Sequence, residues 1–356
     1  MRGIQMVRPE AGAAKLVTGL PVPEPGAGEV RVRVARTAIC GTDRHIFHWD
    51  DSVSHMLTPP VIIGHEFCGY IDALGPGVDG WATGDYVSAE MHLVCGTCRA
   101  CRAANQHICE NTRIKGLHES GCFTEFVVLP TSNLVALDAD IVPEEIGSFL
   151  DALGNAVHTV QSATSIAGRH VLVSGYGAIG AMAAAVVEFE GAASLTITEV
   201  APGHLDRARE WASQLSGRVP VKVVHPADEG FLESVRDTTS GGVDVVLEMS
   251  GAKPAINAAL ELLYPGGEMV MLGIPNGQAL TLDGFSRNVI FKGLTLRGVL
   301  GRQMFATWHE MLSLLGRGLD VRHIVTHRLP LRGFADGIAL LDAGDAHKVV
   351  LDPFAD

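Results

Sequence analysis

Two patterns of apolar and polar positions divide the chain into a first and a second part. In the first part, residues 29–39 have the pattern of a strand, and residues 61–70 form an apolar strand after a Pro-Pro break. From about residue 165, short apolar runs alternate with longer segments of helical character. Strands that alternate with helices are typical of a doubly wound parallel sheet, so this part is predicted to have that α/β fold.

A glycine-rich turn opens the second part. Residues 170–175 read as a short buried strand and residues 178–191 as a helix, with GYGAIG between them in G-x-G-x-x-G register. Its three glycines allow a tight turn and a close backbone approach, so that a pyrophosphate can rest on the helix N-terminus. The same rhythm continues through residues 195–200, 243–251, 254–263, 266–275 and 293–301.

The residue at the end of the second strand of this part bears on the cofactor. Glu199 stands where a carboxylate can bind a ribose 2′-hydroxyl. A carboxylate there would repel a 2′-phosphate, and no Arg or Lys follows within the next seven residues. The pattern therefore predicts a Rossmann domain that binds NAD rather than NADP. A doubly wound sheet without a dinucleotide is the alternative.

Composition restricts the class of protein. A chain of 356 residues, 47% of them hydrophobic, suits two domains with ample cores. The formal charge of −13 and the pI near 5.6 argue against a nucleic acid or an anionic membrane as partner. The longest apolar runs are shorter than the roughly 18 residues of a membrane span, and no secretory signal is visible. We therefore expect a cytoplasmic, reduced protein, in which disulfides are rare.

Four of the seven cysteines are crowded into VCGTCRACRAANQHIC. Cys95, Cys98, Cys101 and Cys109 follow the spacing C-x2-C-x2-C-x7-C. Four thiolates on short loops can surround Zn²⁺ tetrahedrally and close its coordination shell, which leaves no position for a substrate. The cluster is therefore predicted to be a structural zinc site. An iron–sulfur cluster and four unrelated buried thiols are the alternatives.

A second group of candidate ligands comes from separate segments. Cys40 follows the strand at 29–39, His65 and Glu66 end an apolar stretch, and Asp151 begins a helix-like segment. Cys40, His65 and a carboxylate would form the three-ligand arrangement with one open position that a catalytic zinc requires. Spacing alone leaves open whether these segments meet. An ordinary His-Glu pair at a strand end is the alternative.

Taken together, these motifs resemble the zinc-dependent medium-chain dehydrogenase/reductase family over essentially the whole chain. The likeness rests on AICGTDRH, GHEFCG, the four-cysteine loop and GYGAIG. Within the family, FLDALGNAVHT, LEMSGAKPA and IFKGLTLRGVLGRQMFATW are most similar to the L-threonine 3-dehydrogenases. The resemblance implies a GroES-like, β-rich catalytic domain of residues 1–153 and 298–356 and a Rossmann NAD-binding domain of residues 154–297. It also implies a homotetramer.

The resemblance gives each matching metal ligand a role. Cys40 and His65 would bind a catalytic zinc, in addition to the structural one. Glu66 would be a ligand that exchanges with water or substrate. Asp151 would complete or approach the shell, although some family members use the longer Glu at this position.

The remaining matches concern proton transfer, the substrate and the dinucleotide. Thr42 and His45 match the family's proton relay between substrate, nicotinamide ribose and solvent. His92 matches a histidine near the substrate pocket of the threonine enzymes. The residues expected to contact NAD are Gly175, Gly177, Ala178, Ile179, Gly180 and Glu199, with Leu272, Ile274, Leu300 and Gly301 flanking the nicotinamide.

The activity implied is oxidation of a secondary alcohol by hydride transfer to NAD, with L-threonine as substrate and 2-amino-3-oxobutanoate as product. Relatives with similar metal sites oxidise polyols, sugars or aminocyclitols, which is the alternative. A non-catalytic dinucleotide-binding protein is a third hypothesis, and the complete set of candidate ligands argues against it.

Overall fold

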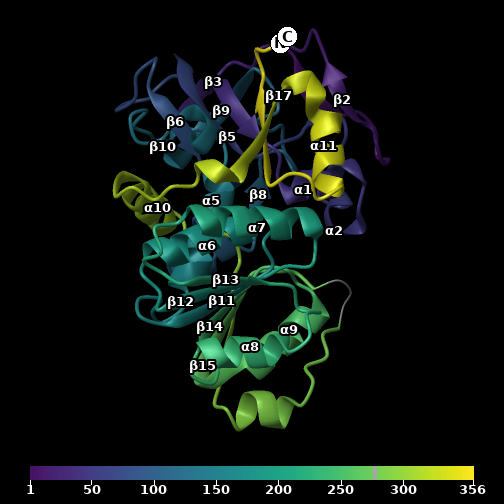
Figure 1. Ribbon diagram of the computed structural model, residues 1–356. Coiled ribbons are helices and arrows are strands. Elements are labelled where there is room, and N and C mark those ends of the chain that lie inside the picture. The colour runs from purple at the N-terminus through teal and green to yellow at the C-terminus, as the bar shows by residue number, and fades with distance from the viewer. Residues whose placement is uncertain (276–278) are drawn as a thin grey trace. The chain divides into compact units, whose positions relative to one another are not determined.

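The computed structural model describes residues 1–275 and 279–356 and divides the chain into two compact units (Figure 1). Unit 1 consists of Met1–Ala152, Gln303–Gly316 and Val325–Asp356. Unit 2 consists of Leu153–Arg302 and Arg317–Ile324. The chain thus leaves the first unit and returns to it twice.

Unit 1 is built on β-sheets. A three-stranded sheet has the order β2-β1-β4, and a seven-stranded sheet has the order β10-β6-β5-β3-β18-β17 with β9 paired to β3. A small two-stranded sheet joins β7 and β8. The strands are β1 (Gly3–Met6), β2 (Ala14–Val17), β3 (Glu29–Ala38), β4 (Val61–Ile62), β5 (Phe67–Leu74), β6 (Tyr86–Ala89), β7 (His92–Leu93), β8 (Arg113–Ile114), β9 (Phe126–Pro130), β10 (Leu134–Ala136), β17 (Val325–Pro330) and β18 (Lys348–Asp352).

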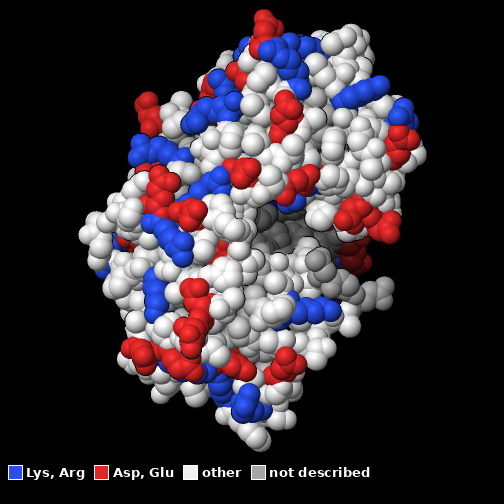
Figure 2. Space-filling view, turned by 45° about the vertical axis from the view of Figure 1, so that its right-hand side comes forward, with Lys and Arg blue, Asp and Glu red and all other residues white. Residues whose placement is uncertain are grey.

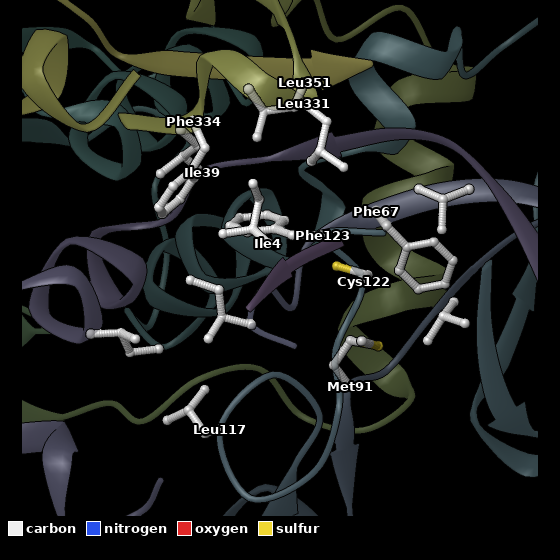
Figure 3. Packing of buried hydrophobic residues seen from close by; sticks show 14 of the residues in the cluster. Ile4, Ile39, Phe67, Met91, Leu117, Cys122, Phe123, Leu331, Phe334 and Leu351 are labelled. Atoms are coloured by element: carbon white, nitrogen blue, oxygen red, sulfur yellow. The ribbon is translucent and has the colours of Figure 1, made fainter. Parts of the chain in front are cut away.

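Strand β3 is the centre of this unit. It pairs with β5, β9 and β18, and the buried positions Val30, Val32 and Val34 alternate along it as a half-buried strand requires. Figure 3 shows side chains from distant segments gathered in the core, among them Ile4, Phe123 and Phe334. The α-helices of the unit are α1 (Gly41–Phe47), α2 (Asp51–Ser54), α3 (Arg99–Arg102), α4 (Glu144–Gly147), the start of α5 (Leu150–Gln161), α10 (Ala306–Gly316) and α11 (Phe334–Asp342).

Unit 2 is a doubly wound Rossmann sheet. Its six parallel strands have the order β13-β12-β11-β14-β15-β16, which is 3-2-1-4-5-6 in chain order. Figure 1 shows α6 and α7 on one side of the sheet and α8 and α9 on the other. The elements are β11 (His170–Ser174), α6 (Ala178–Phe189), β12 (Ser194–Thr198), α7 (Pro202–Gln214), β13 (Val221–Val224), α8 (Phe231–Thr238), β14 (Val243–Glu248), α9 (Lys253–Leu262), β15 (Leu263–Met271) and β16 (Thr295–Gly298).

The predicted α/β fold class is confirmed. Strand β11 is buried along almost its whole length, as a strand covered by helices on both faces must be. The strands and helices predicted around GYGAIG are present, and the structure adds β13, α7 and α8 between the second and fourth strands.

Surface charge is mixed on the face drawn in Figure 2. Lys and Arg side chains lie among Asp and Glu side chains there, without a large area of one sign. Among the described residues, no helix has both the length and the apolar character needed to cross a bilayer.

Candidate active site and cofactor cradle

The first candidate ligand lies where β3 ends and α1 begins. Cys40 is the N-terminal cap residue of α1. The carboxylate of Asp43, in the first turn of that helix, accepts a hydrogen bond of 2.9 Å from the Cys40 backbone N–H. Because Asp43 is fully buried, the backbone that carries the Cys40 thiol is held in one conformation.

The structure brings three of the predicted zinc ligands together. The sulfur of Cys40, a ring nitrogen of His65 and a carboxylate oxygen of Glu66 all lie within 4.8 Å of one another. His65 and Glu66 connect β4 to β5, and the pairing of β5 with β3 brings their end of the strand to the end that carries Cys40. The spacing of these residues in the sequence did not show whether their segments meet. The pairing of β5 with β3 brings them together.

Asp43 is a member of this site that the sequence analysis did not select. Its Oδ1 lies 3.7 Å from Nδ1 of His65. Burial alone would lower the pKa of His65, but the charges of Asp43 and Cys40 raise it to about 10. The surroundings of this buried ring therefore favour a positive charge. Its place in CGTDRH, three residues after Cys40, was the signal that could have identified it.

Glu66 has a buried cation as its partner. Nζ of Lys348 lies 2.7 and 2.5 Å from the two carboxylate oxygens of Glu66 and donates a further hydrogen bond of 3.2 Å to the Ile39 carbonyl. Burial alone would lower the pKa of Lys348, but the charge of Glu66 raises it. Lys348 is only 2% exposed and lies beside the metal-ligand group.

Asp151 belongs to a second group of side chains. Its carboxylate, a carboxylate oxygen of Glu90 and a ring nitrogen of His92 lie within 4.8 Å of one another. The charge of Asp151 also contributes to raising the pKa values of His65 and Lys348. The structure thus puts Asp151 near the first group, with Glu90 and His92 as its immediate neighbours.

The two predicted relay residues lie on α1. Thr42 and His45 are three residues apart, which puts them on the same helix face, and the Thr42 hydroxyl lies 3.8 Å from the Cys40 sulfur. Nδ1 of His45 lies 3.0 Å from a carboxylate oxygen of Asp50, and the His45 side chain is 55% exposed. The helix therefore carries one polar group next to the metal-ligand group and a second one at the solvent.

The donor set of the first group fits a zinc ion. One thiol, one imidazole and one carboxylate are the ligand types of catalytic zinc sites, which keep a position for substrate. Among the described residues, His65 Nδ1 and Asp43 Oδ1 are buried without a hydrogen-bond partner. A cation bound by the other ring nitrogen would polarise the imidazole and strengthen its pairing with Asp43.

The four-cysteine loop fits a second zinc ion. The four sulfurs lie within 4.8 Å of one another, with Cys109 3.6 Å from Cys95 and 3.8 Å from Cys98. Thiolates at ~2.3 Å from a tetrahedral ion are about 3.8 Å apart, whereas a disulfide joins its sulfurs at ~2.05 Å. Backbone N–H groups point at the thiol of Cys95 and lower its pKa to about 5, which favours the ligating thiolate.

In unit 2, the three fingerprint glycines have three different environments. Gly175 has a φ of +95°, a conformation that favours glycine. A Cβ on Gly180 would lie 2.0 Å from the Gly175 carbonyl oxygen, so Gly180 permits close packing of α6 against the turn. A Cβ on Gly177 would meet nothing within 4 Å. Gly177 precedes α6, so the open space lies at the helix N-terminus, which attracts anions.

Glu199 binds the same turn. One oxygen accepts a hydrogen bond of 2.6 Å from the Tyr176 N–H, and the other accepts bonds from the N–H groups of Val200 and Ala201 at 2.7 and 2.8 Å. Burial alone would raise the pKa of Glu199, but His204 and these N–H groups lower it to about 2. The carboxylate is therefore charged and also holds the glycine-rich turn in place, a role that the sequence analysis did not foresee.

The other predicted cofactor residues follow the carboxyl ends of parallel strands. Leu272 and Ile274 come after β15, and Leu300 and Gly301 come after its neighbour β16. Ile274 and Leu300 are 86% and 60% exposed. In doubly wound sheets this edge is where ligands bind, and two large apolar side chains are exposed there.

Comparison with known proteins identifies the family. The model for the alcohol dehydrogenase GroES-like domain matches residues 26–139, and the model for zinc-binding dehydrogenases matches residues 178–317. An L-threonine 3-dehydrogenase of Sinorhizobium medicae is 41% identical over 355 residues, covering 99% of this chain and 98% of its own. One of Proteus mirabilis is 40% identical over 337 residues, with 94% and 95% covered.

Solved structures agree with this result. A protein of Sinorhizobium meliloti described as a zinc-binding dehydrogenase and solved with NADP has a TM-score of 0.87 at 27% identity, with 99% of both chains covered. An alcohol dehydrogenase of Thermus has a TM-score of 0.85 at 28% identity, again with 99% of both chains covered. Together with the convergent Cys40–His65–Glu66 group and the Rossmann sheet, these similarities establish that the chain belongs to the zinc-binding alcohol dehydrogenase family.

Proposed function

We propose that the protein oxidises the secondary hydroxyl of L-threonine to 2-amino-3-oxobutanoate, with zinc and NAD as cofactors. The observation that carries this proposal is the similarity of about 40% over nearly the whole chain to L-threonine 3-dehydrogenases, in a protein whose Cys40, His65 and Glu66 donors converge.

In this proposal Cys40 and His65 hold the catalytic zinc, Glu66 is an exchangeable ligand, and Asp151 completes or approaches the shell. When bound, zinc acts as a Lewis acid that lowers the pKa of the substrate hydroxyl, and NAD accepts the hydride. Asp43 orients the His65 ring. Lys348 pairs with Glu66 and holds its carboxylate beside Cys40 and His65.

Thr42 and His45 conduct the proton in this proposal. Thr42, close to the Cys40 sulfur, would accept the hydroxyl proton of the substrate while its own hydroxyl proton passes to the nicotinamide ribose and on to His45. His45 stands one helical turn further on, and its exposed ring, paired with Asp50, passes the proton to water. A half-buried acceptor followed by an exposed one on one helix face suits this direction of transfer.

The glycine-rich turn binds the pyrophosphate in this proposal, with Ala178 and Ile179 in the first turn of α6, and Glu199 binds the adenosine ribose. Leu272, Ile274, Leu300 and Gly301 flank the nicotinamide. A charged carboxylate at Glu199 disfavours a 2′-phosphate, so NAD is the preferred dinucleotide. The neighbour solved with NADP makes this choice worth measuring directly.

Two alanine variants separate cofactor binding from packing. Gly177→Ala is expected to leave the melting temperature unchanged and to weaken NAD binding by roughly tenfold or more, because the new methyl group occupies only the space that the pyrophosphate needs. Gly180→Ala is expected to lower the melting temperature by about 5 °C, because its Cβ meets a backbone oxygen at 2.0 Å. Thermal unfolding and calorimetric titration with NAD⁺ measure both effects. Unchanged NAD affinity in Gly177→Ala would contradict the proposed cradle.

A substrate screen tests the activity itself. L-threonine, L-serine, 2,3-butanediol, sorbitol and glucose are each offered to the zinc-loaded protein with NAD⁺ and with NADP⁺. We expect the highest kcat/KM for L-threonine with NAD⁺. A higher value for any polyol or sugar refutes the threonine assignment in favour of the alternative, and a preference for NADP⁺ refutes the role of Glu199. Two zinc ions per chain together with turnover exclude a binding-only protein.

We propose further that the protein is a homotetramer of the reducing cytoplasm. None of the seven cysteines forms a disulfide, as that compartment favours. Strand β16 is an edge strand of its sheet, and Ile290 and Phe291 just before it are 59% and 82% exposed. An exposed edge with apolar neighbours is a surface that association would cover.

A further inference from the structure

The carboxylate of Glu90 is buried between two side chains from distant segments. One oxygen, Oε1, lies 2.7 Å from Nδ1 of His92 and accepts a hydrogen bond of 3.1 Å from the His92 backbone N–H. The other, Oε2, accepts a hydrogen bond of 3.0 Å from the indole N–H of Trp308 in α10. Glu90 is 0% exposed and Trp308 is 1% exposed.

The chemistry of these partners determines where the protons are. An indole N–H and a backbone N–H can only donate, so both oxygens of Glu90 act as acceptors, as an ionised carboxylate does. With Glu90 ionised, the short contact with His92 is an Nδ1–H donating to Oε1. In the neutral imidazole this leaves the lone pair on Nε2.

The backbone around Glu90 holds this arrangement in place. The side chain of Met91, between Glu90 and His92, points into the hydrophobic core (Figure 3). The Asn133 amide donates hydrogen bonds of 2.7 and 3.1 Å to the carbonyls of Glu90 and His92. The His92 side chain is 26% exposed. Asp151 lies beside His92 and is close enough to His65 for its charge to raise the pKa of that ring. Glu90 engages Nδ1 of His92, so Nε2 is the ring nitrogen that points to other partners.

We propose that Glu90, held by Trp308, is a positioning residue that fixes the Nδ1–H tautomer of His92 and so makes Nε2 an acceptor for a donor group beside the reacting carbinol. A substrate ammonium is such a group, and the carboxylates of Glu90 and Asp151 favour its positive charge. This inference rests on the proposed function for the identity of the substrate. The tautomer is inferred from the hydrogen-bond partners of Glu90 and does not depend on the substrate.

Kinetic selectivity is the first test. 3-Hydroxybutanoate has the carbon skeleton of threonine without its amino group and is measured as a substrate or as a competitive inhibitor. In Glu90→Gln and Trp308→Phe, we expect the preference for L-threonine over this analogue to fall about tenfold, mainly through KM, because a hydrogen bond to a charged group is lost. The control Ser88→Ala removes another buried hydrogen bond of the same region, to Phe67, and should leave the preference unchanged. An unchanged preference in Glu90→Gln would refute the substrate part of the proposal.

The tautomer is tested separately by nitrogen NMR of the zinc-loaded protein labelled with ¹⁵N-histidine, in which the His92 signals are those that disappear in His92→Gln. We expect a protonated Nδ1 in the wild type and a mixture of tautomers in Glu90→Gln. A proton on Nε2 in the wild type, or an unaltered spectrum in Glu90→Gln, would overturn the positioning role. A wild type that ignores threonine but has the expected spectrum would contradict the proposed function and support the role of Glu90.

Discussion

Replacing Cys40 by serine is expected to abolish turnover while sparing NAD binding. Loss of an outer-shell partner of a metal site costs about 10–100-fold, so loss of a thiolate ligand should cost at least about a hundredfold in kcat/KM. Cys40 belongs to unit 1 and the glycine-rich turn to unit 2, so NAD affinity should stay within about twofold. Steady-state kinetics, zinc analysis and NAD titration on the same preparation measure all three quantities.

The zinc content of the variants shows whether the loss of turnover comes from loss of the catalytic zinc. Cys40→Ser should fall from two zinc ions per chain to one, with the melting temperature little changed. Cys122→Ala is the matched control, because Cys122 is a buried thiol outside both metal groups, and it should keep both ions and its activity. Wild-type turnover by a Cys40→Ser protein at full metal content would remove the basis of the proposed function.

Replacing Cys98 by serine is expected to have its largest effect on the stability of the four-cysteine loop. The loop has little core of its own, as the 48% exposure of Ile108 indicates, so the metal supplies most of its folding free energy. Arg99 and Arg102 lie exposed between the cysteines and are tryptic sites. Losing about 3 kcal/mol of local stability raises the open population, and therefore the rate of cleavage, roughly a hundredfold.

Limited trypsin digestion followed by mass spectrometry gives this rate for Cys98→Ser, with Cys40→Ser as the comparison. Both variants lack one zinc ion, but only the first should be cut within the loop. Equal cleavage in the two proteins would mean that the loop does not depend on its own metal. Residual turnover in an uncut Cys98→Ser protein is expected, because the four sulfurs have no open position for a substrate.

Sequence alone determined the features that are local in the chain. The four cysteines lie within fifteen residues, and a loop that short can close on one ion whatever surrounds it. The turn GYGAIG is also local, because its strand, its three glycines and its helix are consecutive in the chain. Each glycine could be given a reason before any coordinates were considered, and Gly180 has the close contact that the pattern predicts.

Tertiary structure decided which distant side chains meet. The pairing of β18 with β3 brings Lys348 to Glu66, 282 residues away, and the position of α10 within unit 1 brings Trp308 to Glu90, 218 residues away. Spacing predicts neither contact, because a buried carboxylate needs a donor but does not specify where in the chain that donor comes from. The sheet and the core select it, because they bring that donor within hydrogen-bonding distance of the carboxylate.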